Sequence, residues 1–400
     1  MKSNPVKTDD HQEESSFGLY IHWPFCVSKC PYCDFNSHVR ETVDEALWEK
    51  ALLKDLAFMG QLTYSSEQNR VLTSVFFGGG TPSLMPPRIV EKLLSALEKY
   101  WRVSPSLEIT LEANPNSVEV ARLKAFKQAG VNRLSLGIQS LHKQALSFLG
   151  RKHSVDEAVQ ALEAARKIFE RFSFDLIYAR SGQTLQDWEG ELTRALALAG
   201  DHLSLYQLTI EPGTAFYTAH QRGDWRIPEE ELAADLYQLT QEKMSASGRP
   251  CYEVSNYARP GQECRHNLVY WRYQDYAAIG PGAHGRLTVD GKTLATRAHK
   301  APETWLKAVE SHNGLAEKIP LTPEETFSEA LLMGLRLREG VSWHRLESLN
   351  SLQTHRLKSS DALQSLIEEG LMVTTGTHLI VTEAGLLKLN ALIRYLLKAL

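Results

Sequence analysis

The chain has 400 residues, which is too long for one small module and fits a barrel of roughly 250 residues with a smaller domain. Hydrophobic residues make up 43% and charged residues 23% of the chain, which excludes a disordered, collagen-like or coiled-coil protein. The formal net charge of −4 at pH 7 argues against a basic protein that coats nucleic acid.

The chain begins with a polar segment. Residues 1–16 lack an apolar core, so we interpret them as a disordered leader rather than a secretory signal. No apolar run along the chain approaches the roughly 18 residues that a membrane-spanning helix needs. We therefore expect a cytoplasmic protein without a membrane span, for which any membrane contact would be peripheral.

From residue 17 to about 210, short β-rich runs alternate with amphipathic stretches of helical periodicity. Such alternation is typical of parallel βαβ units. Periodicity alone does not separate a barrel from a doubly wound sheet, and in both folds ligands bind at the carboxyl ends of the strands. The expected strands are 18–22, 73–77, 107–112, 133–137, 172–178 and 202–208, and the expected helices are 42–60, 88–101, 118–129, 154–169 and 185–199.

Beyond these units the composition changes twice. Residues 211–320 are rich in proline, glycine and aromatic residues, which indicates added strands and loops. Residues 321–400 are mostly helical, with a hairpin pattern at 371–382. Helices closed by a small hairpin predict a winged-helix-like domain. Because this region has no excess of basic residues, we assign it to packing or protein contact rather than to DNA binding.

Three of the five cysteines lie within eight residues, at Cys26, Cys30 and Cys33. In a cytosolic chain, such clustering indicates metal or redox chemistry rather than cross-linking. Three thiolates on one loop fit three corners of an iron–sulfur cube and leave one iron open to another ligand. The alternatives are incidental clustering and a zinc site with a distant fourth ligand. Candidates for that fourth ligand are Cys251, Cys264 and His38.

The segment YIHWPFCVSKCPYCDF at 20–35 resembles the cluster loop of radical S-adenosylmethionine (SAM) enzymes, whose pattern is CxxxCxxC. The resemblance implies an incomplete parallel (β/α)6 barrel that holds a [4Fe–4S] cluster on the three cysteines and binds SAM at the open iron. The start of the segment is similar to the oxygen-independent coproporphyrinogen oxidase branch, which includes dehydrogenases and haem chaperones. The dehydrogenases carry another cysteine where this chain has Phe35, and they have a longer arm than the 19 residues before Tyr20.

Polar residues at the carboxyl ends of the expected strands are candidates for the SAM pocket. Glycine lets a backbone amide approach a ligand, and GGGTP at 78–82 resembles the family segment that contacts the methionine amino group. Alone, such a glycine run is equally typical of a tight turn. A zwitterion with a ribose requires a cation and several acceptors. The resemblance assigns to this pocket Tyr20, Phe35, Gly79, Gly80, Thr81, Glu112, Gln139, Arg151 and Asp175.

The loop after the fifth expected strand departs from the family pattern. The family often has GLPGQT there, whereas this chain has Ala179–Thr184 with Arg180 at its entrance. We expect Arg180 to be a solvated loop residue, with contact to a propionate or a phosphate as the alternative.

The segment RHNLVYW at 265–271 contains HNxxYW and resembles the motif that marks the haem chaperones of this branch. It offers an imidazole for iron, an amide for hydrogen bonding and aromatic side chains to cover a flat macrocycle. A buried His–Asn turn with a packing tryptophan is the alternative. We expect Cys251 and Cys264 to be packing residues. The resemblance assigns haem contact to His266, Asn267, Tyr270 and Trp271, with His266 as an axial ligand or as a residue behind it.

Taken together, the resemblances imply a haem chaperone on a radical SAM scaffold, with a [4Fe–4S] cluster, SAM and haem as cofactors. Its expected partners are acceptor haem proteins, respiratory ones among them, and no nucleic acid. We assign no catalytic residue. The main alternative is a coproporphyrinogen III dehydrogenase of haem biosynthesis, and a further one is a radical SAM enzyme with another substrate, such as a methyltransferase.

Overall fold

The computed structural model describes residues 16–64 and 70–400. Except for Ser16, the expected leader at 1–16 lies outside the described residues. In the part of the chain that is described, the largest sheet has twelve strands, in the order β14-β13-β12-β11-β1-β4-β5-β6-β7-β8-β10-β9. A separate three-stranded sheet lies in the C-terminal region, with the order β15-β17-β16.

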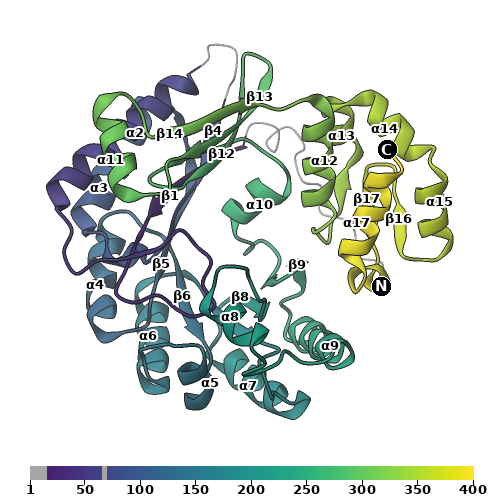
Figure 1. The fold of residues 1–400 in the computed structure, drawn as a ribbon, viewed down its shortest axis with the longest axis horizontal. Helices are drawn as coiled ribbons and strands as arrows, with labels where there is room; N and C mark the ends of the chain where they lie inside the picture. The colour runs from purple at the N-terminus through teal and green to yellow at the C-terminus, as the bar shows by residue number, and fades with distance from the viewer. Residues whose placement is uncertain (1–15, 65–69) are drawn as a thin grey trace.

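The centre of the large sheet is parallel. Its six consecutive strands form five parallel pairs, which confirms the (β/α) arrangement expected from the sequence. The ends of the whole sheet, β14 and β9, are not neighbours, so the barrel is incomplete (Figure 1). The six strands are β1 (Ser16–Trp23), β4 (Val71–Gly79), β5 (Arg102–Ala113), β6 (Arg133–Gln139), β7 (Arg171–Tyr178) and β8 (His202–Gln207).

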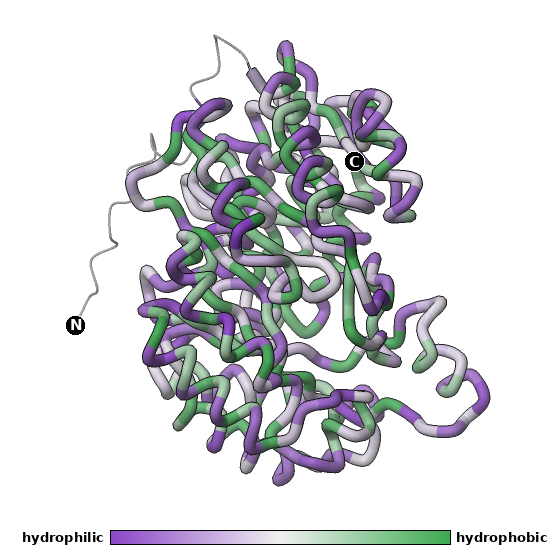
Figure 2. The backbone as a smooth tube through the Cα atoms, turned by 90° about the vertical axis from the view of Figure 1, so that its left-hand side faces the viewer, coloured by the Kyte–Doolittle hydropathy of each residue, from purple (hydrophilic) through white to green (hydrophobic). Residues whose placement is uncertain are grey.

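The strands alternate between the two faces of the sheet, as a period of two requires. In β1, Phe17, Leu19 and Ile21 are fully buried in the main core. The residues between them, including Tyr20 and His22, point to the opposite face, toward the interior of the barrel. Figure 2 shows hydrophobic stretches in the inner segments, whereas the surface helices alternate between hydrophilic and hydrophobic turns.

Helices follow the strands and cover the outside of the barrel (Figure 1). Two of them start at capping boxes, Ser154 with Glu157 and Thr184 with Asp187, which fix the first turn of each helix. The short α5 was not expected. The helices of this part are α2 (Glu45–Leu62), α3 (Pro87–Ser95), α4 (Ser117–Gln128), α5 (Lys143–Phe148), α6 (Val155–Ile168) and α7 (Leu185–Leu198), with 3-10 helices at Pro82–Leu84 and Leu97–Lys99.

Residues 211–320 contain more helix than the sequence indicated. Their helices are α8 (Ala215–Gln221), α9 (Glu230–Ala246), α10 (Arg265–Trp271) and α11 (Pro302–Ser311). The whole HNxxYW motif, residues 266–271, therefore belongs to helix α10, which lies between the two arms of the open sheet (Figure 1).

The strands of this region extend both edges of the sheet. β11 (Tyr276–Ile279) pairs in parallel with β1 and so adds a parallel strand that was not expected. It continues into antiparallel β12 (His284–Val289), β13 (Lys292–Ala298) and β14 (Leu315–Pro320). At the other edge, β10 (Asn256–Ala258) and β9 (Cys251–Glu253) follow β8.

The C-terminal region has a core of its own, which includes Phe327, Leu331 and Leu346. Helices and a small sheet with the expected hairpin form it, in agreement with a winged-helix-like shape. None of the described helices is both long and apolar enough to cross a bilayer. The elements are α12 (Pro323–Gly334), β15 (Val341–Ser342), α13 (Trp343–Leu349), α14 (Ser351–Lys358), α15 (Asp361–Glu368), β16 (Met372–Thr374), β17 (His378–Val381), α16 (Glu383–Leu386) and α17 (Leu389–Lys398).

Candidate functional site

A cavity of about 240 Å³ lies at the carboxyl ends of the parallel strands, under the cysteine loop. Its walls come from that loop and from the ends of β4, β5, β6 and β7. Most of the residues assigned to the SAM pocket share this cavity, whereas Tyr20 and the HNxxYW residues do not line it. The assigned residues in the lining are Cys26, Cys30, Cys33, Phe35, Gly79, Gly80, Thr81, Glu112, Gln139, Arg151 and Asp175.

The end of β4 is fastened to the cysteine loop through the main chain. The Gly80 amide donates to Trp23 O at 2.7 Å, and the Thr81 amide donates to Phe25 O at 2.8 Å. A Cβ on Gly80 would lie 2.8 Å from Phe25 O and from the Pro24 carbonyl carbon. Gly80 therefore has to be small to admit the cysteine loop, and it also lines the cavity.

The far end of the cysteine loop is fastened by a buried histidine. Burial lowers the pKa of His22 to about 4, so its ring is neutral at pH 7. Nε2 lies 2.9 Å from Asn36 O and must donate, which leaves Nδ1 to accept from Tyr20 Oη at 3.1 Å. Asn36 in turn donates to Pro281 O at 2.9 Å. The loop is thus joined to β1 and to the connection between β11 and β12. A short parallel bridge between β2 (Phe25–Cys26) and β3 (His38–Val39) closes it.

The three clustered thiols are half-buried. Burial raises the pKa of Cys26, while the Thr81 hydroxyl, at 3.3 Å from its Sγ, favours the thiolate. Arg151 Nη1 donates to Cys30 Sγ at 3.3 Å. No group of three or more His, Cys, Asp or Glu side chains within residues 16–64 and 70–400 is placed to hold a single metal ion. The three thiols of this donor set therefore fit separate irons of a cube better than one zinc ion.

The remaining candidates for a zinc ligand make other contacts. Cys251 Sγ donates to Glu253 O at 2.6 Å, and Cys264 Sγ donates to Glu108 Oε1 at 3.5 Å. Burial raises the pKa of both thiols to about 12. His38 Nε2 contacts Asn36 Oδ1 at 3.3 Å. Both cysteines pack in the interior, as the sequence indicated.

Arg151 is the cation of the cavity. Its Nη2 donates to Asn114 Oδ1 at 2.6 Å and to Gly137 O at 2.8 Å. Its Nε is buried and has no hydrogen-bond partner, so a carboxylate of a bound ligand would satisfy it. Asn114 also donates to Thr81 Oγ1 at 3.2 Å. Asn114 lies two residues after the expected strand 107–112 and was not assigned to the pocket, because a single amide carries no distinctive signal.

Two partly buried carboxyl groups, Glu112 and Asp175, face the cavity from β5 and β7. Burial, reinforced by the charge of Asp175, raises the pKa of Glu112 to about 8. Burial raises the pKa of Asp175 to about 6. Without a ligand, Glu112 therefore holds a proton at neutral pH. A positively charged group bound nearby would favour its carboxylate form.

The loops after β6 and β7 share one buried carboxylate. Glu191 Oε1 accepts from the Ser140 hydroxyl at 2.5 Å and from the Leu141 amide at 2.7 Å, and Oε2 accepts from Arg180 Nη2 at 2.6 Å. Arg180 is buried, so the expectation of a solvated loop residue is wrong, and the residue is not part of the cavity lining. Gln139, at the start of one of these loops, has a positive φ of 66°, which a non-glycine residue rarely adopts. The ion pair therefore supports a strained pocket residue.

Helix α10 fills the interior of the barrel below the cavity. His266 Nδ1 lies 2.9 Å from Ser74 Oγ, Nε2 lies 2.7 Å from Tyr270 Oη, and the ring stacks on Phe76 at 5.1 Å. Burial and the charge of Arg133 lower the pKa of His266 to about 3. Both ring nitrogens are occupied, so binding of iron through Nε2 would require the hydrogen bond with Tyr270 to break, whereas the one between Nδ1 and Ser74 could remain. This geometry favours the buried-turn alternative for the motif.

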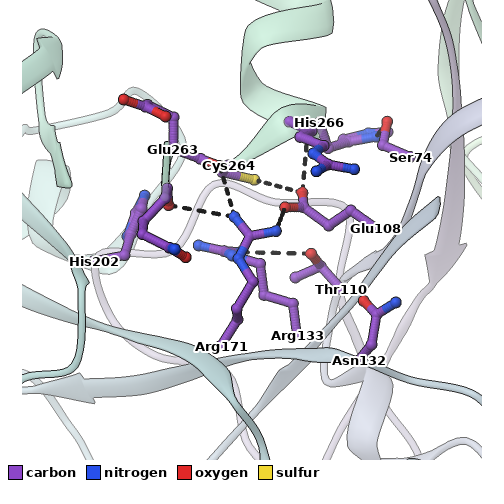
Figure 3. A network of polar contacts seen from close by, with 12 residues as sticks. Ser74, Glu108, Thr110, Asn132, Arg133, Arg171, His202, Glu263, Cys264 and His266 are labelled. Atoms are coloured by element: carbon purple, nitrogen blue, oxygen red, sulfur yellow. Dashed lines mark hydrogen bonds and ion pairs between the residues drawn. The ribbon is translucent and has the colours of Figure 1, made fainter. Parts of the chain in front are cut away.

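A charged network holds the start of α10 (Figure 3). Glu108 accepts from Arg171 Nη1 at 2.6 Å and from the His266 amide at 3.3 Å. The other end of α10 reaches the C-terminal core: Tyr273 Oη donates to Glu329 at 2.6 Å, and Arg345 donates to Tyr273 O at 2.5 Å.

Comparison with known proteins assigns residues 20–195 to the Radical SAM superfamily and residues 321–387 to the HemN C-terminal domain. A Bos taurus relative, "Radical S-adenosyl methionine domain-containing protein 1, mitochondrial", is 39% identical over 96% of this chain and 87% of its own. "Heme chaperone HemW" of Escherichia coli is 35% identical over 95% of this chain and 97% of its own. The Synechocystis protein of the same name is 39% identical over 86% and 84%.

Among solved structures, "Coproporphyrinogen III oxidase (HemN) from Escherichia coli is a Radical SAM enzyme" matches with a TM-score of 0.77. The match covers 96% of this chain and 90% of that one, at 23% sequence identity. At this level of identity, the match establishes the fold alone.

The buried ion pair predicts a large loss of stability in Glu191→Ala, because Arg180 would stay buried without its partner. We expect the free energy of unfolding, from urea denaturation, to fall by about 3–5 kcal/mol. Glu189→Ala is the matched control, since Glu189 lies on the same helix and its ion pair with Lys243 is exposed. That variant should lose less than about 1 kcal/mol. Equal losses of unfolding free energy in the two variants would contradict the conclusion that the Arg180–Glu191 ion pair supports the loop at Gln139.

The raised pKa of Glu112 predicts a pH dependence of stability in the ligand-free protein. The unfolded chain releases this proton near the ordinary value of 4.5, whereas the folded chain keeps it up to about pH 8. The contribution to stability is therefore complete below pH 4.5 and is lost as the pH rises to 8. Glu112→Gln should flatten the decline of the melting temperature between pH 5 and 8, while Glu98→Gln, at an exposed site, should keep the wild-type slope. A wild-type slope in Glu112→Gln would contradict the assignment.

Proposed function

This chain belongs to the radical SAM superfamily, and on that premise we propose that it is a haem chaperone that uses a [4Fe–4S] cluster and SAM and delivers haem to acceptor haem proteins. The similarity to proteins named heme chaperone HemW, at 35–39% identity over most of the chain, supports the proposal. The observation that favours a chaperone over a dehydrogenase is the presence of Phe35. This side chain lines the cavity and is 60% exposed at the position where the dehydrogenases have a cysteine.

The residues of the cavity suit a cluster and a zwitterionic ligand. Cys26, Cys30 and Cys33 would hold the cluster, and Arg151 would bind the ligand's carboxylate through its unpaired Nε. In this superfamily the bound cluster supplies an electron that cleaves SAM. The chain's own residues keep the site in place: Thr81 donates to one cluster thiol and Arg151 donates to another.

Glu112 and Asp175 suit the positive charges of SAM. Both are partly buried at the cavity wall, where an isolated carboxylate is costly but a paired one is not. Tyr20 lies behind them: its hydroxyl donates to His22, and its ring stacks on Phe76 with a centroid distance of 6.3 Å. We propose that Tyr20 is a positioning residue that holds the cysteine loop in a fixed position relative to the pocket.

We propose the cytoplasm as the location, with respiratory haem proteins among the acceptors. The Bos taurus relative is named as mitochondrial, so location is not common to all relatives. The HemN similarity leaves the dehydrogenase as the competing function, because the two proteins share a fold.

The cluster assignment predicts that Cys30→Ala binds much less iron and sulfide. Removal of one thiolate leaves two protein ligands, which are too few to hold a cube. Anaerobic reconstitution, followed by iron and sulfide analysis, should give at least a fivefold lower content than wild type. Cys251→Ala, a variant of a cysteine outside the cavity, should keep the wild-type content. Equal content in Cys30→Ala would refute the cluster site.

A second prediction separates the chaperone from the dehydrogenase. The reconstituted protein, with SAM and a reductant under anaerobic conditions, should not convert coproporphyrinogen III to protoporphyrinogen IX. The same preparation should bind haem and transfer it to an apo-haem protein, measured by the absorption of the acceptor. Robust turnover of coproporphyrinogen III, or no haem binding, would overturn the proposed function.

A further inference from the structure

Helix α8 lies at the mouth of the barrel, directly against the cysteine loop. The Phe216 amide donates to Pro31 O at 2.9 Å, and the Phe216 and Tyr32 rings lie 6.2 Å apart. Leu149, Ile177, Leu208 and Phe216 form a small apolar cluster there. None of the functional residues described so far belongs to this helix.

One residue of α8 is a half-buried histidine with a defined tautomer. His220 Nδ1 lies 3.3 Å from Trp225 O. Because a carbonyl oxygen only accepts, Nδ1 carries the proton, and Nε2 keeps a lone pair. No described group forms a hydrogen bond with Nε2. A histidine that binds a metal almost always donates its other N–H in this way.

The surroundings of His220 suit a flat, apolar ligand with acidic groups. The Trp225 ring lies 5.5 Å from the His220 ring and 4.8 Å from that of Phe216. Tyr217 is 37% exposed and, three residues before His220, lies on the same helix face. Arg226 is exposed and has no ion pair or hydrogen bond among the described residues. Aromatic surfaces and a cation match a porphyrin and its propionates.

We infer that His220 Nε2 is the axial ligand of the haem iron, an assignment that rests on the proposed function. Tyr217 and Trp225 supply the aromatic surface, and Arg226 supplies the charge for a propionate. The contrast with His266 supports this choice, since both nitrogens of that ring are hydrogen-bonded and the residue is 1% exposed. The haem site then lies at the edge of the barrel opening, and the HNxxYW helix fills the barrel interior below it.

The test is a haem titration of wild type and His220→Ala, followed by absorption and by dissociation constant. Loss of an axial imidazole should shift the Soret band and weaken binding at least tenfold. Free imidazole added to the variant should restore the wild-type spectrum, which a purely structural role would not allow. His220→Gln, which keeps a polar side chain at the surface, should show the same shift.

The control is His355→Ala, which changes an exposed histidine on α14 of the C-terminal domain and should keep the wild-type spectrum and affinity. Iron and sulfide content should be equal in all variants. If wild type binds haem and both His220 variants bind it with unchanged spectrum and affinity, this inference is wrong, and the chaperone proposal stands. If wild type binds no haem, the proposed function fails, and the inference fails with it.

Discussion

The contact between Gly80 and the backbone of Pro24 and Phe25 is the constraint on which the mouth of the barrel depends. Both partners in this contact are main-chain groups. A side chain at position 80 would therefore push the cysteine loop away. The loop cannot move without moving its thiols, and Thr81 and Arg151 both donate to those thiols. The orientation of the loop is thus set by the end of β4 rather than by the cysteines themselves.

The interior of this barrel is polar, which is costly unless every buried group has a partner. Glu108 and Arg171 form a partly buried ion pair, and Arg133 Nη2 donates to Ser173 at 3.1 Å. Closer to the cavity the compensation is incomplete, and the carboxyl group of Glu112 keeps a proton. At the mouth, Nε of Arg151 also lacks a hydrogen-bond partner, so a ligand with charges of its own would be stabilised there.

The six central strands and the cysteine loop could be predicted because their signals are local: alternation within each strand, glycines at one strand end and a fixed cysteine spacing. The environment of Arg180 could not be predicted, because its partner Glu191 has the spacing of any surface helix residue and is buried only through Ser140 and Leu141. The motif HNLVYW was recognised, but its placement was not. A helix of seven residues has too few turns to show a period, and its position depends on Ser74 and Glu108, which lie far away in sequence.

Helix α10 has one end inside the barrel and the other in the C-terminal core. At the first end His266 stacks beside Phe76 and Tyr20, and just beyond the second end Tyr273 contacts Glu329 and Arg345. A displacement of the C-terminal domain that moved Tyr273 would therefore act on a helix of seven residues, about two turns, whose other end carries His266.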